Sequence, residues 1–458
     1  MTKTEEKYFY RSAGAADLID FINKIPANKL SQKIPDFLDE LLINEDKGIQ
    51  NLLSYSLINY LGEKEAGIIA RHISSDKINI RNFAGELLIK IGAKAVPALI
   101  KYLVSVSDDD DLKFTIDILG MIGDSKAGDT LISVLLSAQN ENVIVACIEA
   151  LGNIKYEEAV DYIMMCYDKK DVYKMYVIEA LSKIGSAKAL EFLHNKYPDE
   201  NEFTRLTMIE TMGVIGDEET FFFLLSELNE REGAIVCTIM EAILKLKDKF
   251  GFDIPFDEKM KNAVIQTVFA ADPDYKEVAV YLISLFHDRE ILDACLRIYG
   301  KDPELDSIIK HKFFDYQNYN LLELAALINE KPANLQPLLF LLQHVLDEFD
   351  RRERKIQNVE YRNLIDSITK CLEYPHEEIR KSAMSILFRL DTGIALMFLD
   401  IMVRDDNVWN RLHLLDLLAD IDIEQTKDAL SVLMKDDNEM VAEKSRSLLE
   451  FNYQTEKP

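Results

Sequence analysis

A short unit recurs along this chain at a nearly constant period, and this repeat constrains the fold more than any other feature. Its first residues lie 31, 32, 30 and 31 positions apart. A repeat of this length indicates stacked supersecondary units, each of which covers the hydrophobic face of its neighbour. The sequence therefore predicts a solenoid. The units are Leu88-Ile-Lys-Ile-Gly92, Leu119-Gly-Met-Ile-Gly123, Leu151-Gly-Asn-Ile-Lys155, Leu181-Ser-Lys-Ile-Gly185 and Met212-Gly-Val-Ile-Gly216.

One repeat, taken in full, predicts a pair of helices. The first helix spans 95–106 and has Pro97 in its opening turn, where the missing N–H is harmless. The run from Asp108 to Asp111 supplies an N-cap and carboxylates that suit the helix dipole. The second helix spans 112–122, and Gly123 follows it as a left-handed C-terminal residue. We interpret the other glycines of the repeats as C-caps in the same way.

The composition is strongly acidic. The chain has 53 Lys and Arg residues against 80 Asp and Glu residues, a net charge of −27. This charge argues against a general binder of the phosphate backbone, which needs basic surfaces. The N-terminal residues contain no apolar segment typical of a signal peptide, and no run of 18 apolar residues occurs. We therefore expect a cytoplasmic protein without a membrane span.

The residues that usually carry chemistry are dispersed. No two cysteines form a CxxC pair, so buried free thiols in a reducing compartment are expected. The histidines form no HExxH motif, and no phosphate-binding glycine motif is present. The sequence thus predicts no catalytic residue, no metal site and no cofactor. The five cysteines are Cys147, Cys166, Cys237, Cys295 and Cys371.

The repeat resembles the short HEAT repeats of the phycobilisome-lyase type. The resemblance lies in Ile80-Arg81-Asn82-Phe83-Ala84 and Ala95-Val96-Pro97-Ala98-Leu99, and it returns at 378–383 and 410–411. It implies an all-α, armadillo-like fold, namely a right-handed α-solenoid of about a dozen stacked antiparallel helix pairs. It also implies that the second helix of each pair lines the concave side.

The regularity of the repeat changes along the chain. Residues 1–30 are expected to form an N-terminal cap, 31–247 regular repeats, 248–375 divergent or enlarged helical repeats, and 376–458 C-terminal repeats and a tail. The equivalent positions Glu241 and Asp293 are 52 residues apart, 21 more than one period of 31. Residues 251–255 are predicted to be the loop that opens this insertion.

A series of carboxylates occupies one equivalent position in six consecutive second helices. Helices that pack side by side lie about 8–10 Å apart, so these groups would form an acidic ladder along one face. Such a face attracts a basic partner. The acidic ladder comprises Glu86, Asp117, Glu149, Glu179, Glu210 and Glu241, and Asp293 and Asp416 extend the series.

A simpler interpretation of the acidic ladder is repeat consensus, in which the acids serve helix propensity and solubility. Four members have a cation four residues later, which would neutralise them locally. These pairs are Glu86/Lys90, Glu179/Lys183, Glu241/Lys245 and Asp293/Arg297. Asp117, Glu149 and Glu210 lack such a cation, so we expect these three to be solvent-exposed and to contact the partner.

Other residues are candidates for contacts within the chain or with a partner. The equivalent cations Arg81, Lys174, Arg205, Arg380 and Arg411 are expected to bond turn carbonyls or Asp residues between repeats. Trp409, with Arg411 beside it, is a candidate partner contact, because Trp and Arg are frequent at interface hot spots. The alternative is that this single Trp lies in the core.

These observations favour a non-enzymatic scaffold or adaptor that binds a protein, expected to be basic. The alternative implied by the resemblance is a bilin-lyase-like enzyme subunit or chromophore chaperone. Nucleic-acid binding, known for other HEAT-like proteins, would need a basic face, whereas the acidic ladder has the opposite charge. The iron-dependent hydroxylases of the family hold metal with several His-Glu dipeptides, but only His376-Glu377 occurs here.

Overall fold

The computed structural model describes residues 9–455 except 11, 45, 229–230, 272–274, 316–320 and 352–355. Every regular element in this part of the chain is a helix, so the all-α prediction is confirmed. The chain forms two compact units. Unit 1 comprises Met1–Glu227 and Glu241–Ile254, and unit 2 comprises Leu228–Met240 and Pro255–Pro458.

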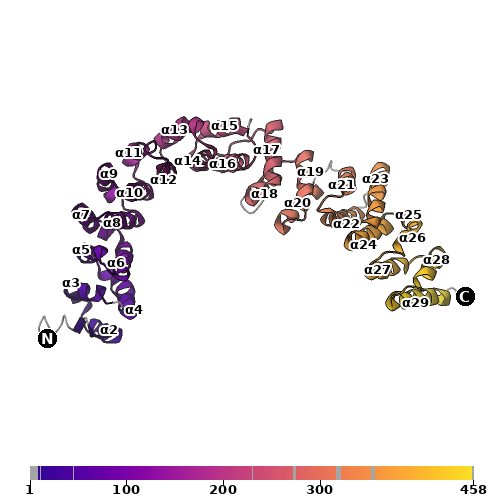
Figure 1. Cartoon of the computed structure of the whole chain (residues 1–458), viewed down its shortest axis with the longest axis horizontal. Helices are drawn as coiled ribbons and strands as arrows, with labels where there is room; N and C mark the ends of the chain where they lie inside the picture. Colours follow the sequence, from indigo (N-terminus) through magenta and orange to yellow (C-terminus); the bar gives the residue numbers. More distant parts are fainter. Residues whose placement is uncertain are drawn as a thin grey trace. The chain divides into compact units, whose positions relative to one another are not determined.

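Unit 1 is a stack of helix pairs in which first and second helices alternate (Figure 1). Its helices are α2 (Ala15–Asn23), α3 (Ala27–Leu42), α4 (Lys47–Asn51), α5 (Glu63–Ala70), α6 (Ile78–Ile91), α7 (Val96–Ser105), α8 (Asp109–Ile122), α9 (Gly128–Ser137), α10 (Glu141–Asn153), α11 (Val160–Met164), α12 (Asp171–Ile184), α13 (Ala187–Lys196), α14 (Glu202–Ile215), α15 (Glu218–Glu227) and the C-terminal part of α16 (Ala234–Phe250).

The two helices of each pair lie in different layers of unit 1. The second helices α8, α10, α12 and α14 pack against one another in chain order. Figure 1 shows these helices on the inner side of the curve that the repeats of unit 1 follow, with α7, α9, α11 and α13 on the outer side. The arrangement of this unit therefore agrees with the position that the resemblance implies for the second helices.

Glycines end several second helices, as the repeat predicts. Helices α6, α8, α12 and α14 each end one residue before the repeat glycine. Gly123 has a φ of +75°, in the left-handed region. The expectation of a left-handed cap is wrong for Gly216, whose φ is −62°. There a Cβ would lie 2.2 Å from the carbonyl oxygen of Met212, so close packing rather than left-handed backbone excludes a side chain.

A second set of glycines lies inside the last turn of second helices, and the interpretation of all repeat glycines as C-caps is wrong for them. A Cβ added to Gly152 in α10 would lie 2.7 Å from the Cα of Ala180 in α12. A Cβ on Gly213 in α14 would lie 2.8 Å from the Cα of Ala242 in α16. These glycines allow neighbouring second helices to approach closely, as native packing density requires.

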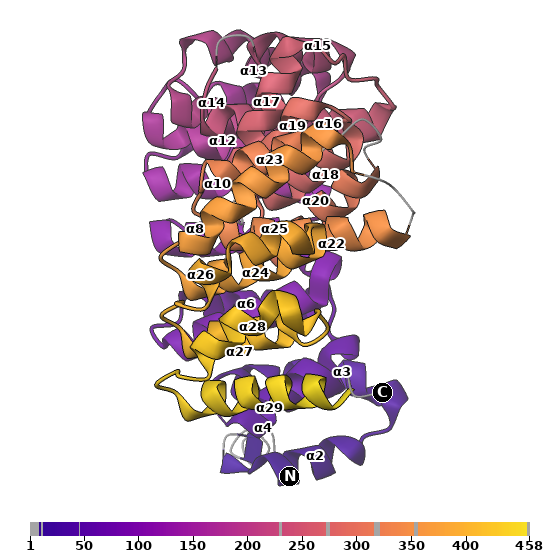
Figure 2. The ribbon, with the colours of Figure 1, turned by 90° about the vertical axis from the view of Figure 1, so that its right-hand side faces the viewer.

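Unit 2 continues the helix pairs. Its helices are α17 (Glu258–Phe269), α18 (Lys276–Leu285), α19 (Arg289–Ile298), α20 (Pro303–Asp315), α21 (Leu321–Asn329), α22 (Leu335–Arg351), α23 (Asn358–Thr369), α24 (Glu377–Leu390), α25 (Thr392–Met397), α26 (Leu399–Met402), α27 (Val408–Leu418), α28 (Ile423–Leu433) and α29 (Glu439–Thr455). Figure 2 shows α24, α27 and α29 following one another, and the three pack in that order.

The long interval between Glu241 and Asp293 contains an additional helix. Residues 251–256 have no regular structure, as predicted, and two helices, α17 and α18, then precede α19, where the regular repeat would have one. Helix α17 packs against both α18 and α19. The insertion is therefore helical rather than an extended loop.

The five cysteines are buried free thiols, as expected. Burial raises the pKa of the Cys371 thiol to about 11 and that of Cys295 to about 12. Because the thiolate is the reactive form, these groups are inert near neutral pH. They contribute to packing rather than to chemistry.

Candidate protein-binding surface

The acidic ladder lies on the second-helix layer of unit 1. Both sequence neighbours of each carboxylate are buried. Glu149, for example, lies between the buried residues Ile148 and Ala150 in α10. Among the three acids expected to be exposed, Glu210 is exposed, Glu149 is half-buried and the Asp117 side chain is 29% exposed. Glu86 and Glu179 are exposed, and Glu241 is half-buried. None of the six is fully buried.

Neighbouring carboxylates of the acidic ladder act on one another electrostatically. Partial burial raises the pKa of Glu149, and the negative charges of Glu179 and Asp117 on the adjacent helices raise it further. Partial burial likewise raises the pKa of Glu210, with a further contribution from Glu241. Negative charges on neighbouring helices therefore oppose ionisation of Glu149 and Glu210, as like charges close to each other do.

Local ion pairing differs from the sequence expectation at three positions. Asp117, expected to lack a cation, is bonded by Lys113 Nζ at 2.7 Å, from one turn before it rather than after it. Lys90 does not pair with Glu86 but lies 4.8 Å from the centre of the Tyr55 ring. At the third position Arg297, expected to pair with Asp293, bonds Glu330 at 2.8 Å.

The other two expected ion pairs of the acidic ladder are confirmed. Lys183 bonds Glu179 at 2.6 Å, and Lys245 bonds Glu241 at 2.7 Å. Within the described residues, Glu86, Glu149 and Glu210 have no cation within 4 Å. Of these three, Glu149 and Glu210 have another member of the acidic ladder on each side in the sequence of repeats.

We expect replacement of Glu149 by Gln to stabilise unit 1 at pH 7. The raised pKa means that the folded state holds the proton more tightly than the unfolded state, so the charged carboxylate opposes folding above that pKa. The cost disappears as the pH falls toward the ordinary Glu value of about 4.3. The gain should be below about 1 kcal/mol. Denaturant unfolding at pH 7 and pH 4 measures it.

The control is Glu179→Gln, which removes the ion pair with Lys183 and should bring no gain. Equal unfolding midpoints for wild type and Glu149→Gln at pH 7 would contradict the electrostatic account of this position.

An acidic pocket of about 570 Å³ adjoins the ladder at the N-terminal ends of α6 and α8. Its lining contains two cations. Arg81 donates to the carbonyl of Asp110 at 2.8 Å and pairs with Asp111 at 3.1 Å, while Lys113 holds Asp117. The cations are outnumbered, so the pocket retains excess negative charge. Its carboxylates are Asp76, Asp108, Asp110, Asp111 and Asp117.

The pocket is not arranged for a metal ion. Asp108 caps α8 by accepting hydrogen bonds from the amides of Asp110 and Asp111 at 3.0 and 3.1 Å, as the sequence predicts. Among the residues that the structure describes, no group of three His, Cys, Asp or Glu side chains could hold a metal.

The equivalent cations of the repeats bond within the chain, as expected. Arg205 Nε donates to the carbonyl of Tyr197 at 3.0 Å, Lys174 bonds Glu200 at 3.0 Å, and Arg411 Nε bonds Asp436 at 2.6 Å. Arg380 forms a two-bond pair with Asp405 at 2.8 and 2.9 Å. These side chains join turns and successive repeats.

Trp409 is 66% exposed at the start of α27 in unit 2, so the alternative that it belongs to the core is wrong. The adjacent Arg411 has both Nε and Nη2 bonded to Asp436. The role of Trp409 in partner binding stays a prediction. The same holds for Arg411, whose guanidinium already has an internal partner.

Two exposed apolar residues near the acidic ladder were not recognised from the sequence. Phe203 in the first turn of α14 is 67% exposed, and Val172 in the first turn of α12 is also exposed. Both were indistinguishable in sequence from core residues of the helical pattern. One signal in the sequence could have identified them. Each lies two residues before a cation of the repeat, Arg205 or Lys174, just as the candidate contact Trp409 lies two residues before Arg411.

Comparison with known proteins identifies HEAT repeats in residues 96–175, which run from α7 into α12. The fold is similar to a crystal structure of importin beta, with 12% identity and a TM-score of 0.43 over 98% of this chain and 70% of that chain. It is also similar to yeast importin-beta (Kap95p), with 12% identity and a TM-score of 0.39 over 99% of this chain and 66% of that chain.

No curated protein sequence matches the chain significantly. The matched repeats and the stacked helix pairs make the protein an α-solenoid that contains HEAT repeats. Nothing in these similarities singles out the phycobilisome-lyase type. Among the described residues, no helix combines the length and apolar character needed to span a bilayer.

Proposed function

We propose that this chain is a non-enzymatic scaffold or adaptor, and that the acidic ladder of unit 1 binds a basic segment of a partner protein. The observation that carries the proposal is that Glu149 lies between Asp117 and Glu179 on the adjacent helices and has no cation of its own. Partial burial and these two negative charges raise the pKa of Glu149, and a bound cation would offset the repulsion. The chain would thereby favour a basic partner over an acidic or neutral one.

An extended protein segment suits this surface better than a compact ligand. The carboxylates come from successive packed helices, which lie about 8–10 Å apart. A single small cation can neutralise the carboxylate of only one helix, whereas a peptide with several Lys or Arg residues can pair with carboxylates on several successive helices. Exposed Val172 and Phe203 on the same helix layer offer apolar contact area for the side chains between the cations.

The bilin-lyase alternative has no specific support among the contacts described above. It would need a site that holds a tetrapyrrole, and the pocket that adjoins the acidic ladder is lined mostly by polar and charged side chains. We therefore carry forward the scaffold function alone.

The test is a double charge reversal, Glu149→Lys with Glu210→Lys. Asp117 is left in place because Lys113 already neutralises it. A fluorescent peptide rich in Lys and Ala is titrated with the full chain, and anisotropy gives Kd. We expect the double variant to bind about tenfold more weakly or worse at low salt, which corresponds to about 1.4 kcal/mol. The dependence of Kd on salt should also become flatter.

The matched control is Glu158→Lys with Glu191→Lys, two exposed acids away from the acidic ladder that give the same change in net charge. Surface substitutions of this kind usually cost less than about 0.5 kcal/mol, so both variants should fold. If the two double variants weaken binding equally, only net charge matters and the acidic ladder is repeat consensus.

A further inference from the structure

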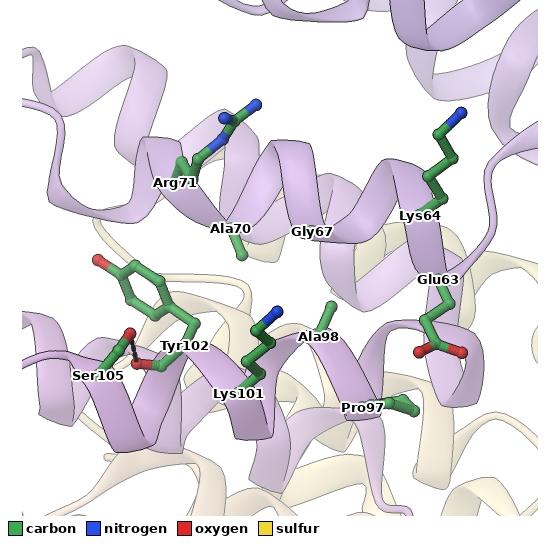
Figure 3. Close-up of a pocket in the computed structure, with 10 residues that line it drawn as sticks. All are labelled: Glu63, Lys64, Gly67, Ala70, Arg71, Pro97, Ala98, Lys101, Tyr102 and Ser105. Atoms are coloured by element: carbon green, nitrogen blue, oxygen red, sulfur yellow. Dashed lines mark hydrogen bonds between the residues drawn. The ribbon is translucent and has the colours of Figure 1, made fainter.

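The first-helix layer of unit 1 contains a groove between α5 and α7 that is bordered by positive charges, in contrast to the acidic ladder. It has a volume of about 630 Å³. Small residues form the part where the two helices approach, among them Gly67, Ala70 and Ala98 (Figure 3). A Cβ added to Gly67 would lie 4.0 Å from the Cβ of Ala98, an ordinary van der Waals contact. Because these lining side chains are small, a ligand chain in the groove can lie close to the helix backbones.

Three cations border this groove. They are Lys64 on α5, Arg71 directly after the last residue of α5, and Lys101 on α7. Lys64 and Lys101 have no ion-pair partner within 4 Å in the described part of the chain, and Arg71 reaches Asp39 only at 4.0 Å. Asp39 itself is bonded by His72 at 2.7 Å. Glu63 is the one acid in the lining. In a chain with a net charge of −27, such a local excess of positive charge is unusual.

The cations are spread along the groove rather than directed at one point. Lys64 and Arg71 are seven residues apart along α5 and the 3-10 turn that continues it (Arg71–Ser74), a separation of about 10 Å. Figure 3 shows these two side chains toward opposite ends of the α5 segment, with Lys101 on the facing helix between them. One phosphate or carboxylate cannot reach all three. A chain that carries several carboxylates can do so.

We propose that the α5/α7 groove is a second docking surface, which binds an acidic segment of a partner protein. The small residues admit the backbone of that segment, and Lys64, Arg71 and Lys101 pair with its carboxylates. Nucleic acid is a poorer occupant, because its phosphates continue beyond the three cations over the acidic remainder of the chain, whereas a peptide can carry its carboxylates within the groove alone. The proposal is independent of the acidic ladder, which lies on the second-helix layer.

The test uses a fluorescent peptide rich in Glu and Ala, titrated with the full chain. The variant Lys64→Glu with Lys101→Glu should weaken binding by about tenfold or more. The control Lys94→Glu with Lys126→Glu gives the same change in net charge at two exposed lysines outside the groove lining, and should change Kd by less than about twofold. Gly67→Leu fills the groove without changing charge and should also weaken binding.

Failure of the wild-type protein to bind the acidic peptide would overturn the proposal, and so would equal loss of binding by the two double lysine variants. Tighter binding of a DNA oligonucleotide or an anionic vesicle, with the same dependence on Lys64 and Lys101, would overturn it as well. Self-association in sedimentation that the groove variant abolishes would make a second copy of the chain the occupant. The variant Glu149→Lys with Glu210→Lys should still bind the acidic peptide, so failure of the acidic ladder and failure of the groove can be told apart.

Discussion

Replacing Arg380 by Met is expected to destabilise the C-terminal repeats of unit 2 by about 3–5 kcal/mol. The guanidinium donates two bonds to Asp405, at 2.8 and 2.9 Å, and two more to the carbonyls of Tyr374 and Pro375. The side chain of Asp405 is only 2% exposed. Without Arg380 this buried carboxylate would keep its charge without its main partner, which is the costly way to break a buried pair.

Denaturant unfolding followed by circular dichroism should show a lower midpoint. Only part of the unfolding transition should shift, because the repeats of a solenoid can unfold locally. Arg404→Met is the control, since Arg404 is exposed. The double variant Arg380→Met with Asp405→Leu should recover much of the loss, because an apolar pair leaves no unpaired charge. If Arg380→Met unfolds like wild type, the pair does not hold the repeats together.

The same pair gives unit 2 a sensitivity to acid. Burial acts to raise the pKa of Asp405, but hydrogen bonds from Arg380, the Asn407 amide and Asn410 outweigh it and hold the pKa below the usual range. The stabilisation is fully present above the unfolded value of about 3.9 and is lost as the pH falls through the lower folded value. The pH effect of Asp405 is thus opposite in sign to that of Glu149.

Gly152→Ala should destabilise unit 1 by about 1–3 kcal/mol, although alanine is the better helix former. The added Cβ would lie 2.7 Å from the Cα and 2.9 Å from the Cβ of Ala180. Both are atoms close to the backbone, so α10 and α12 must separate to relieve the contact. The variant should show a lower denaturant midpoint with a native helical spectrum in dilute buffer.

Gly67→Ala is the matched control, because its Cβ meets nothing closer than 4.0 Å. It should be neutral or stabilising by up to about 1 kcal/mol, from helix propensity alone. Opposite signs for the two glycine variants would establish that the glycines of the second helices set the spacing between repeats. Destabilisation of both to the same extent would show that position in the helix, not contact, decides the effect.

The 31-residue period was sufficient to predict the helix pairs and the ends of α6, α8, α12 and α14, because these depend on local hydrophobic spacing and on terminal glycines. The role of Gly152 could not be predicted in this way. It depends on Ala180 in the next repeat, and only the packed helices show how closely the two residues approach.

The acidic ladder was visible in the sequence as a repeated position, but its local pairing was not. A lysine can reach a carboxylate from one turn before or one turn after it, and Asp117 uses Lys113. Lys90 is drawn instead to Tyr55 in the preceding repeat. The groove between α5 and α7 combines residues of two helices about one period apart, so no single motif marks it.

The most direct test of the ladder as a protein-binding surface is zero-length carbodiimide coupling between the chain and the Lys-rich peptide. This reaction joins a lysine to a carboxylate only where the two are in contact, and mass spectrometry identifies the joined residues. Coupling should concentrate on Glu149 and Glu210 in the second helices, with little at Glu158 and Glu191 outside the acidic ladder. Coupling that favours Glu158 and Glu191, or spreads evenly over exposed carboxylates, would contradict the account.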